Sequence, residues 1–236
     1  MKRNHLQSQN FLRSPRLVHE LVGHTTIKKN DTVLEIGAGS GVITSVLAKR
    51  VARVIAYEYD ARMLVKLRDN LSKFDNVTLV QGDFLSADLP DASYKVFANI
   101  PFHLSSPIIK KLTESSHRPK SINLIVQKQF ANKFLIDKPS FTGMLGAQVA
   151  PLYIARIRQK LQKTDFWPHP AVDTALPELK LRDEQLIDET KLEKYRQFIA
   201  HCFADPRAYA KAGGKDKKPS ELSTDEWITL FMRHNK

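Results

Sequence analysis

The sequence predicts an α/β protein built on a mostly parallel β-sheet. Short apolar segments alternate with helical segments through most of the chain, and a glycine-rich turn follows the first apolar segment. A chain of 236 residues with 42% hydrophobic residues is long enough and apolar enough to bury a real core. We therefore expect one large α/β domain, with room for a small appendage.

The expected strands and helices follow one another in regular order. Strands are expected at residues 32–36, 53–57, 77–80, 94–98 and 122–126, and helices at residues 42–51, 61–73 and 105–113. Pro107 falls in the first turn of the third helix, where a missing backbone N–H is tolerated. This alternation favours parallel neighbours in the sheet.

The pattern changes after the fifth expected strand. Residues 147–157 and 176–181 are expected to add a closing hairpin, separated by an aromatic and proline-rich segment at 166–172. In that segment Trp167 and His169 are interpreted as parts of a rigid strut that Pro168 and Pro170 hold extended, so neither receives a catalytic role. Beyond about Asp183 the sequence predicts helices at 192–203 and 225–232, joined by a basic loop at 212–219. We expect domains at 1–182 and 183–236.

Composition limits the kind of partner and compartment. The 37 Lys and Arg residues exceed the 25 Asp and Glu residues, and the net charge of +12 suits a polyanion such as RNA. One cysteine, Cys202, excludes an internal disulfide and a cysteine-rich zinc site. The chain shows no signal peptide, no apolar run of membrane-spanning length and no sustained heptads. We expect a cytoplasmic monomer without a membrane partner.

The glycine-rich turn predicts a nucleoside site. Gly37 and Gly39 allow a tight turn and a close approach of a ligand, and Glu58, at the end of the next strand, suits two ribose hydroxyls. The G-x-G-x-G spacing does not favour a pyrophosphate. The acids Glu35, Glu58 and Asp83 are acceptable around a cationic sulfonium, and Asp83 suits an adenine amino group. The pattern therefore predicts S-adenosylmethionine as the cofactor, with no metal.

A second motif, Asn99-Ile100-Pro101-Phe102, points to the reaction. The Asn99 side-chain oxygen and a backbone carbonyl at Ile100 or Pro101 can accept hydrogen bonds from the amino group of adenine. Pro101 adds rigidity, and Phe102 offers a flat face on which the adenine ring can stack. Together with the glycine turn, this motif predicts methyl transfer to that amino group.

Six motifs in order resemble those of one family over nearly the whole chain, the Erm ribosomal RNA adenine methyltransferases. They are Gln9-Asn10-Phe11-Leu12, Glu35-Ile36-Gly37-Ala38-Gly39-Ser40-Gly41, Tyr57-Glu58-Tyr59-Asp60, Gly82-Asp83-Phe84-Leu85, Asn99-Ile100-Pro101-Phe102 and Phe166-x-Pro168-x-Pro170-x-Val172-x-Thr174. The resemblance implies a Rossmann-like class I methyltransferase with a seven-stranded sheet and a small all-helical C-terminal domain. It also implies that Phe102 and Phe166 hold the target adenine. The residues implied to contact the methyl donor are Asn10, Leu12, Gly37, Glu58, Asp83 and Asn99.

The resemblance further implies a substrate and a phenotype. The substrate is one adenosine of the 23S ribosomal RNA, methylated before the ribosome is fully assembled, and the phenotype is resistance to macrolide, lincosamide and streptogramin B antibiotics. Many relatives carry Tyr where this chain has Phe102, which keeps the stacking face and loses a hydroxyl. Catalysis is expected to survive that difference.

Three alternatives stay open. A small-subunit dimethyltransferase of the KsgA type shares the glycine turn and the Q-N-F-L start but characteristically has Leu where this chain has Ile100, which favours Erm. A DNA adenine methyltransferase would usually show a second proline there and a target-recognition insertion. A catalytically silent nucleic-acid-binding factor of the same fold is disfavoured by the intact Asn99, Glu58 and glycines.

Overall fold

A computed structural model describes residues 10–12, 14–135, 142–214 and 216–234. Gln9 of the first motif and Lys215 of the basic loop lie outside the described residues. The chain forms two compact units, Met1–Lys128 with Ile157–Glu178 and Gln129–Arg156 with Leu179–Lys236. Residues 129–156 therefore belong with the C-terminal helices. The expected domain boundary after residue 182 stays a prediction.

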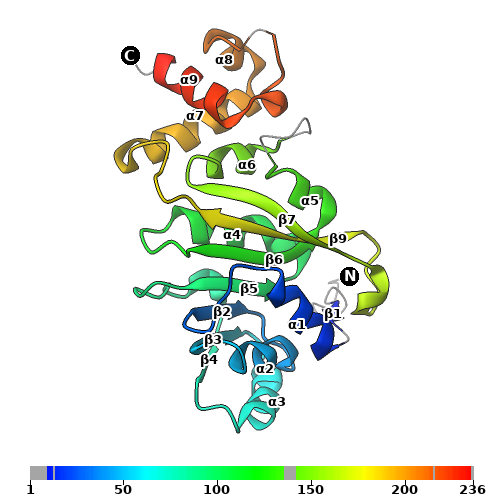
Figure 1. Ribbon diagram of the computed structural model, residues 1–236. Coiled ribbons are helices and arrows are strands. Elements are labelled where there is room, and N and C mark those ends of the chain that lie inside the picture. Colours follow the sequence, from blue (N-terminus) through cyan, green and yellow to red (C-terminus); the bar gives the residue numbers. More distant parts are fainter. Residues whose placement is uncertain (1–9, 13, 136–141, 215, 235–236) are drawn as a thin grey trace. The chain divides into compact units, whose positions relative to one another are not determined.

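Within the described residues, seven strands form one sheet in the order β4-β3-β2-β5-β6-β9-β7, and Figure 1 shows them side by side. All four pairs among β2 to β6 are parallel: β2 with β3, β3 with β4, β2 with β5, and β5 with β6. The predicted α/β class with a mostly parallel sheet is confirmed. The strands are β2 (Thr32–Ile36), β3 (Arg53–Glu58), β4 (Val77–Gln81), β5 (Lys95–Asn99), β6 (Ser121–Gln127), β7 (Tyr153–Leu161) and β9 (Thr174–Leu181).

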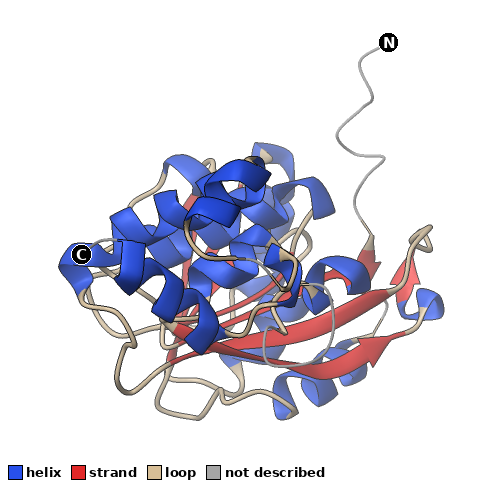
Figure 2. Ribbon diagram, turned by 90° about the horizontal axis from the view of Figure 1, so that it is seen from above, coloured by secondary structure: helices blue, strands red, loops and turns tan. Residues whose placement is uncertain are grey.

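Four helices of the first unit precede or connect its parallel strands, and Figure 2 draws helices in blue and strands in red. They are α1 (Pro15–Gly23), α2 (Val42–Ala48), α3 (Ala61–Leu71) and α4 (Ser105–Glu114). Helix α1 was not predicted, although its signals are local: the Ser14 hydroxyl accepts from the Arg16 N–H at 3.2 Å, and Pro15 occupies the first turn. Asp60 caps α3 in the same way, accepting from the Arg62 N–H at 2.8 Å. No described helix combines the length and the apolar character needed to cross a membrane.

The strand expected at 147–157 begins later than predicted. Residues 147–149 belong to helix α6 (Met144–Val149), and β7 starts at Tyr153. These residues are buried, and periodicity alone cannot distinguish a buried helix from a buried strand. A Cβ on Gly146 would lie 2.0 Å from the Lys133 carbonyl oxygen, so the backbone passes too close here for any side chain.

The second unit is mainly helical and has an aromatic core. It contains α6, α7 (Leu192–Ala204), α8 (Pro206–Lys211) and α9 (Thr224–His234). It also contains α5 (Lys128–Asn132) except for Lys128, which belongs to the first unit. Trp227 is fully buried, and the ring of Phe203 stacks on it at 5.7 Å. The Tyr195 hydroxyl donates to the Ala147 carbonyl at 3.1 Å, which joins α7 to α6. Cys202 packs in α7, where burial raises the pKa of its thiol to about 11.

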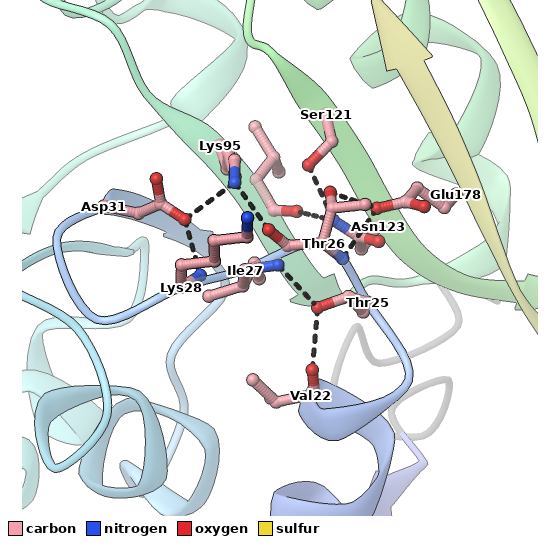
Figure 3. A network of polar contacts seen from close by, with 11 residues as sticks. Val22, Thr25, Thr26, Ile27, Lys28, Asp31, Lys95, Ser121, Asn123 and Glu178 are labelled. Carbon is pink, nitrogen blue, oxygen red and sulfur yellow. Dashed lines mark hydrogen bonds and ion pairs between the residues drawn. The ribbon is translucent and has the colours of Figure 1, made fainter.

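A polar network ties the first unit together at the start of its central strands (Figure 3). The Lys95 ammonium, at the start of β5, contacts the Asp31 carboxylate at 2.7 Å and donates to the Thr26 carbonyl at 2.6 Å. On the other side, the buried Glu178 carboxylate accepts from the Thr26 N–H at 3.0 Å and from Arg158 Nε at 2.7 Å. Each of these four charged side chains has an opposite charge beside it.

Candidate active site

A cavity of about 1140 Å³ opens at the carboxyl ends of β2, β3, β4 and β5 in the first unit. Strand β2 pairs with β3 on one side and β5 on the other, so the order of the strands reverses here, which is where ligands bind in open α/β sheets. Typical small-molecule sites measure roughly 300 to 1000 Å³. The cavity therefore has room for a nucleoside cofactor and for part of a second molecule.

Three glycines shape the turn after β2. Gly37, Gly39 and Gly41 have positive φ angles of 75°, 56° and 87°, a backbone conformation that costs other residues about 1 to 2 kcal/mol. A Cβ on Gly37, which lines the cavity, would meet no atom within 4 Å, so its absence keeps space for a ligand. A Cβ on Gly41 would lie 2.8 Å from Leu67 Cδ1, so this glycine serves packing instead.

Three backbone donors of this turn, those of Gly37, Ala38 and Gly39, are already engaged. The N–H groups of Gly37 and Ala38 both donate to the Tyr57 carbonyl at 2.9 Å, and the Gly39 N–H donates to Glu58 Oε2 at 2.7 Å. A pyrophosphate needs such donors. Glu58 is also held through Oε1, which accepts from the Asp60 N–H at 2.9 Å, and its remaining lone pairs suit the hydroxyls of a ribose. The lining fits a phosphate-free nucleoside, as the spacing predicts.

Asp83 and Phe84 follow β4 at the same edge of the sheet. Asp83 Oδ1 accepts from the Leu85 N–H at 2.9 Å and caps a short 3-10 helix, η2 (Phe84–Ser86). Phe84 is buried against Tyr57, with ring centroids 5.4 Å apart. The cap fixes the Asp83 carboxylate at the cavity wall, where its second oxygen suits an amino group of a ligand.

Asn99 is the last residue of β5 and is oriented by the N-terminal segment. Its Nδ2 donates to the Asn10 carbonyl at 2.7 Å, so the amide oxygen points away from that carbonyl and stays an acceptor. The Pro101 carbonyl accepts from the Leu104 N–H at 2.9 Å, whereas no described residue donates to the Ile100 carbonyl. Of the two backbone acceptors considered from sequence, the geometry favours Ile100. Phe102 is half-buried and lines the same cavity.

Ten of the predicted site residues line this one cavity. They are Asn10, Leu12, Gly37, Gly39, Glu58, Asp83, Asn99, Ile100, Pro101 and Phe102. Their individual roles stay predictions. The further aromatic side chains that line it include Phe11 and the 78% exposed Tyr59. Both belong to the quoted motifs, but nothing in their spacing assigned them a role.

Phe166 differs from its expected place. It lies in β8 (Phe166–Trp167), which pairs antiparallel with β1 (Phe11–Leu12), and its side chain is fully buried in the hydrophobic core. Phe166 pairs with Leu12 on the buried face of this two-stranded ribbon. In this structure its ring packs in the core and does not line the cavity, so its contact with the target adenine stays a prediction.

Glu35 also lies away from the ligand space. It is 1% exposed in the middle of the sheet and does not line the cavity, contrary to its expected place near a sulfonium. Burial raises the pKa of this carboxyl group to about 8, the nearby Thr44 hydroxyl opposes the shift, and the Glu58 carboxylate adds to it. Glu35 is therefore a buried acid beneath the glycine turn. Among the described residues, no three His, Cys, Asp or Glu side chains are grouped as metal ligands.

The fold and the cavity define a Rossmann-like methyltransferase. A family model described as "Ribosomal RNA adenine dimethylase" matches residues 1–212. The chain belongs to this ribosomal RNA adenine dimethylase family. Membership implies S-adenosylmethionine as the methyl donor, and an acceptor-rich lining in which the N–H groups of Gly37, Ala38 and Gly39 are engaged fits that cofactor.

Curated relatives and a solved structure give the same family. The chain is 35% identical to ribosomal RNA small subunit methyltransferase A of Bacillus licheniformis, over 84% of this chain and 72% of the relative. It is also 35% identical to the protein of that name from Thermotoga petrophila, over 95% and 83%. The crystal structure of the 23S rRNA methyltransferase ErmE matches with a TM-score of 0.81 at 27% identity, over 96% of this chain and 100% of that chain.

Proposed function

We propose that the protein transfers methyl groups from S-adenosylmethionine to the exocyclic amine of adenosine in small-subunit ribosomal RNA. The observation that carries the methyl transfer is the Asn99 amide, which the Asn10 carbonyl orients at a cavity that also holds Glu58 and Asp83. The small subunit is favoured because the relatives named as small subunit methyltransferases are 35% identical to the chain, whereas ErmE is 27% identical. This choice corrects the preference for Erm that Ile100 gave from the sequence.

The half of the cavity nearest the glycine turn would hold the cofactor. Glu58 would accept from the ribose hydroxyls, Asp83 from the adenine amino group, and the open side of Gly37 would leave room for the ligand. When bound, S-adenosylmethionine supplies a methyl group activated by a positively charged sulfur. Carboxylates and carbonyls around a cationic ligand are favourable company.

The half of the cavity nearest Asn99 would hold the target base. The Asn99 side-chain oxygen and the Ile100 carbonyl would accept from the two N–H bonds of the amine and fix its lone pair toward the methyl group. Phe102 would stack on the extruded adenine ring. The same two oxygens would stabilise the positive charge that develops on the amine until its proton leaves to solvent. Alignment and electrostatics, without a strong base, would supply the acceleration.

The partner and compartment follow from composition. A net charge of +12 favours a polyanionic substrate, and the ribosomal RNA family makes that polyanion RNA. We keep the cytoplasm and a monomeric state as parts of the proposal.

A second candidate function has one observation in its favour. The fold matches the ErmE structure with a TM-score of 0.81 over 96% of this chain. That likeness is consistent with methylation of 23S ribosomal RNA and with antibiotic resistance. The substrate must therefore be tested directly.

Transfer of tritiated methyl groups from S-adenosylmethionine to protein-free small-subunit and large-subunit ribosomal RNA, assayed separately, distinguishes the candidates. We expect label on adenosine of the small-subunit RNA, at a rate that Asn99→Ala lowers by about 10² to 10³. Mass spectrometry of the digested RNA then counts the methyl groups, and the family description leads us to expect dimethyladenosine. Label only on large-subunit RNA would establish the second candidate. Binding of the cofactor without label on either RNA would indicate a silent binding factor.

A further inference from the structure

The short ribbon formed by β1 and β8 has two faces of different character. Leu12 and Phe166 are register partners and are 6% and 0% exposed, whereas Phe11 and Trp167 are register partners and are 41% and 66% exposed. Side chains directly opposite each other in a strand pair point to the same face. Phe11 and Trp167 therefore share the open face of the ribbon.

This open face is continuous with the cavity. Phe11 lines the cavity, and its ring lies 3.4 Å from the position of a Cβ on Gly39. The preceding residue, Asn10, supplies the carbonyl that orients the Asn99 amide. Trp167 is the register partner of Phe11, so it lies next to the cavity. It is not among the cavity-lining residues, which places its indole outside the reaction space itself.

The exposure of Trp167 is unusual for its residue type and its orientation is fixed. Tryptophan is highly buried on average, as Trp227 is in this chain. The His169 ring meets the Trp167 ring edge to face, with centroids 5.8 Å apart. His169 is itself held, because its Nδ1 lies 2.9 Å from the Lys163 carbonyl, which accepts from it. The indole is thus an exposed flat surface that its neighbours hold in position.

The charges near this surface suit a nucleic acid. Lys160 and Lys163 are exposed on the stretch that leads into β8, and the one acid between them and Trp167, Asp165, accepts from the Gln162 N–H at 2.7 Å. A flat aromatic ring flanked by cations is the combination that binds single-stranded nucleic acid, in which each stacked base contributes and the cations follow the phosphates. A protein partner would not require these cations.

We propose that Trp167 stacks on an RNA base next to the target adenosine and so positions the substrate strand at the cavity. This inference rests on the proposed function, because an extruded adenosine leaves the stack and uncovers a face of each neighbouring base. It also accounts for Phe11, which shares the open face and closes the gap between Trp167 and the cavity. Trp167 is a positioning residue here and does not contact the reacting atoms.

The two tryptophans allow a direct test of contact, because Trp167 is exposed and Trp227 is buried. A small-subunit ribosomal RNA transcript should quench the fluorescence of the wild-type protein. It should leave Trp167→Phe, which emits only from Trp227, nearly unchanged. Polyadenylate serves as a second RNA probe. Absence of quenching by both RNAs would overturn the inference.

Kinetics test whether the contact positions the substrate. Trp167→Ala should raise KM for RNA about tenfold while kcat and the affinity for S-adenosylmethionine stay within about twofold. Trp167→Phe, which keeps a flat ring, should recover part of the loss. Val65→Ala is the matched control, because Val65 is 60% exposed on α3 and does not line the cavity. Thermal unfolding verifies that each variant folds.

The two proposals fail in different ways. A wild-type protein that methylates RNA, with Trp167→Ala retaining the wild-type KM, would overturn the role of Trp167 and leave the function standing. A wild-type protein that methylates neither ribosomal RNA would overturn the function. Quenching at Trp167 would then still decide whether this face of the ribbon contacts RNA.

Discussion

Strand β5 begins at Lys95, whose ammonium contacts Asp31 and Thr26, and ends at Asn99, whose amide has one bonded end and one free acceptor. The same contrast holds across the central strands of the first unit. At their starts, Glu178 accepts from Thr26 (Figure 3). Arg158 also donates to Glu178, which completes a network of matched charges. At their ends, carboxylates and carbonyls face a cavity.

The difference separates stability from chemistry along one set of strands. Buried polar groups are favourable only when their hydrogen bonds are made, so the satisfied network holds the strands in register. Unfilled acceptors at the other end are costly for folding and useful for binding, because a ligand can satisfy them. Substitutions at the starts of the strands should therefore change stability, and substitutions at the cavity should change turnover.

The largest effect is expected at the cavity. Asn99→Ala should lower kcat by about 10² to 10³, the cost of removing one preorganised group that stabilises developing charge. The affinity for S-adenosylmethionine, measured by calorimetry, should change much less, and the free energy of unfolding should hardly change. Asn30→Ala, at an exposed asparagine in the first unit, is the matched control. An Asn99→Ala protein with full turnover would remove the basis of the proposed function.

Glu35 tests the comparison through pH, because it is a buried acid near the carboxyl end of β2, beneath the glycine turn. Its pKa is about 8 in the folded chain and about 4.5 when unfolded, so the folded state holds a proton that the unfolded state has lost between these values. Stability from this group is complete below about pH 4.5 and falls as pH rises to about 8, by about 1 kcal/mol per pH unit. Glu35→Gln should remove this slope. Urea unfolding of both proteins at about pH 5 and about pH 8 measures it, and equal slopes would show that Glu35 is ionised in the fold.

The smallest effect is expected at the starts of the strands. Arg158→Ala leaves the buried Glu178 carboxylate with Thr26 as its partner in the network and should lower the free energy of unfolding by about 2 kcal/mol, since Arg158 is partly exposed. Turnover at a temperature where both proteins are folded should stay near the wild-type value. Arg53→Ala, at an exposed arginine that begins β3, should have little effect on either quantity. A large loss of turnover in Arg158→Ala would break the separation.

The elements with strong local signals were predictable from the sequence. Strand β2 matches its predicted residues, and β3, β4, β5 and β6 differ by one residue at one or both ends. Helix α2 ends three residues early, because its last predicted residues turn toward β3. The prediction of a strand at residues 147–149 was wrong, because these residues belong to helix α6. A segment buried on every side carries no hydrophobic period that distinguishes a helix from a strand.

The site was predictable to the extent that its residues follow strand ends. Glu58, Asp83 and Asn99 end or follow neighbouring strands of a parallel sheet, so their meeting at one edge follows from topology. Phe166 was misplaced because its face depends on which strand it pairs with. A motif of alternating residues does not reveal that partner. Trp167 was interpreted only as part of a rigid strut. In the structure it is the exposed residue of β8, next to the buried Phe166.

The ribbon of β1 and β8 is two residues long on each strand. On each strand one residue is buried and the other is exposed. Because successive side chains of a strand alternate, an insertion or deletion of one residue would exchange the two faces. Phe11 would enter the core, and Leu12 would move to the exposed face of the ribbon. Descendants of this gene should therefore change these four positions by substitution, in pairs across the ribbon, and keep the length of both segments constant.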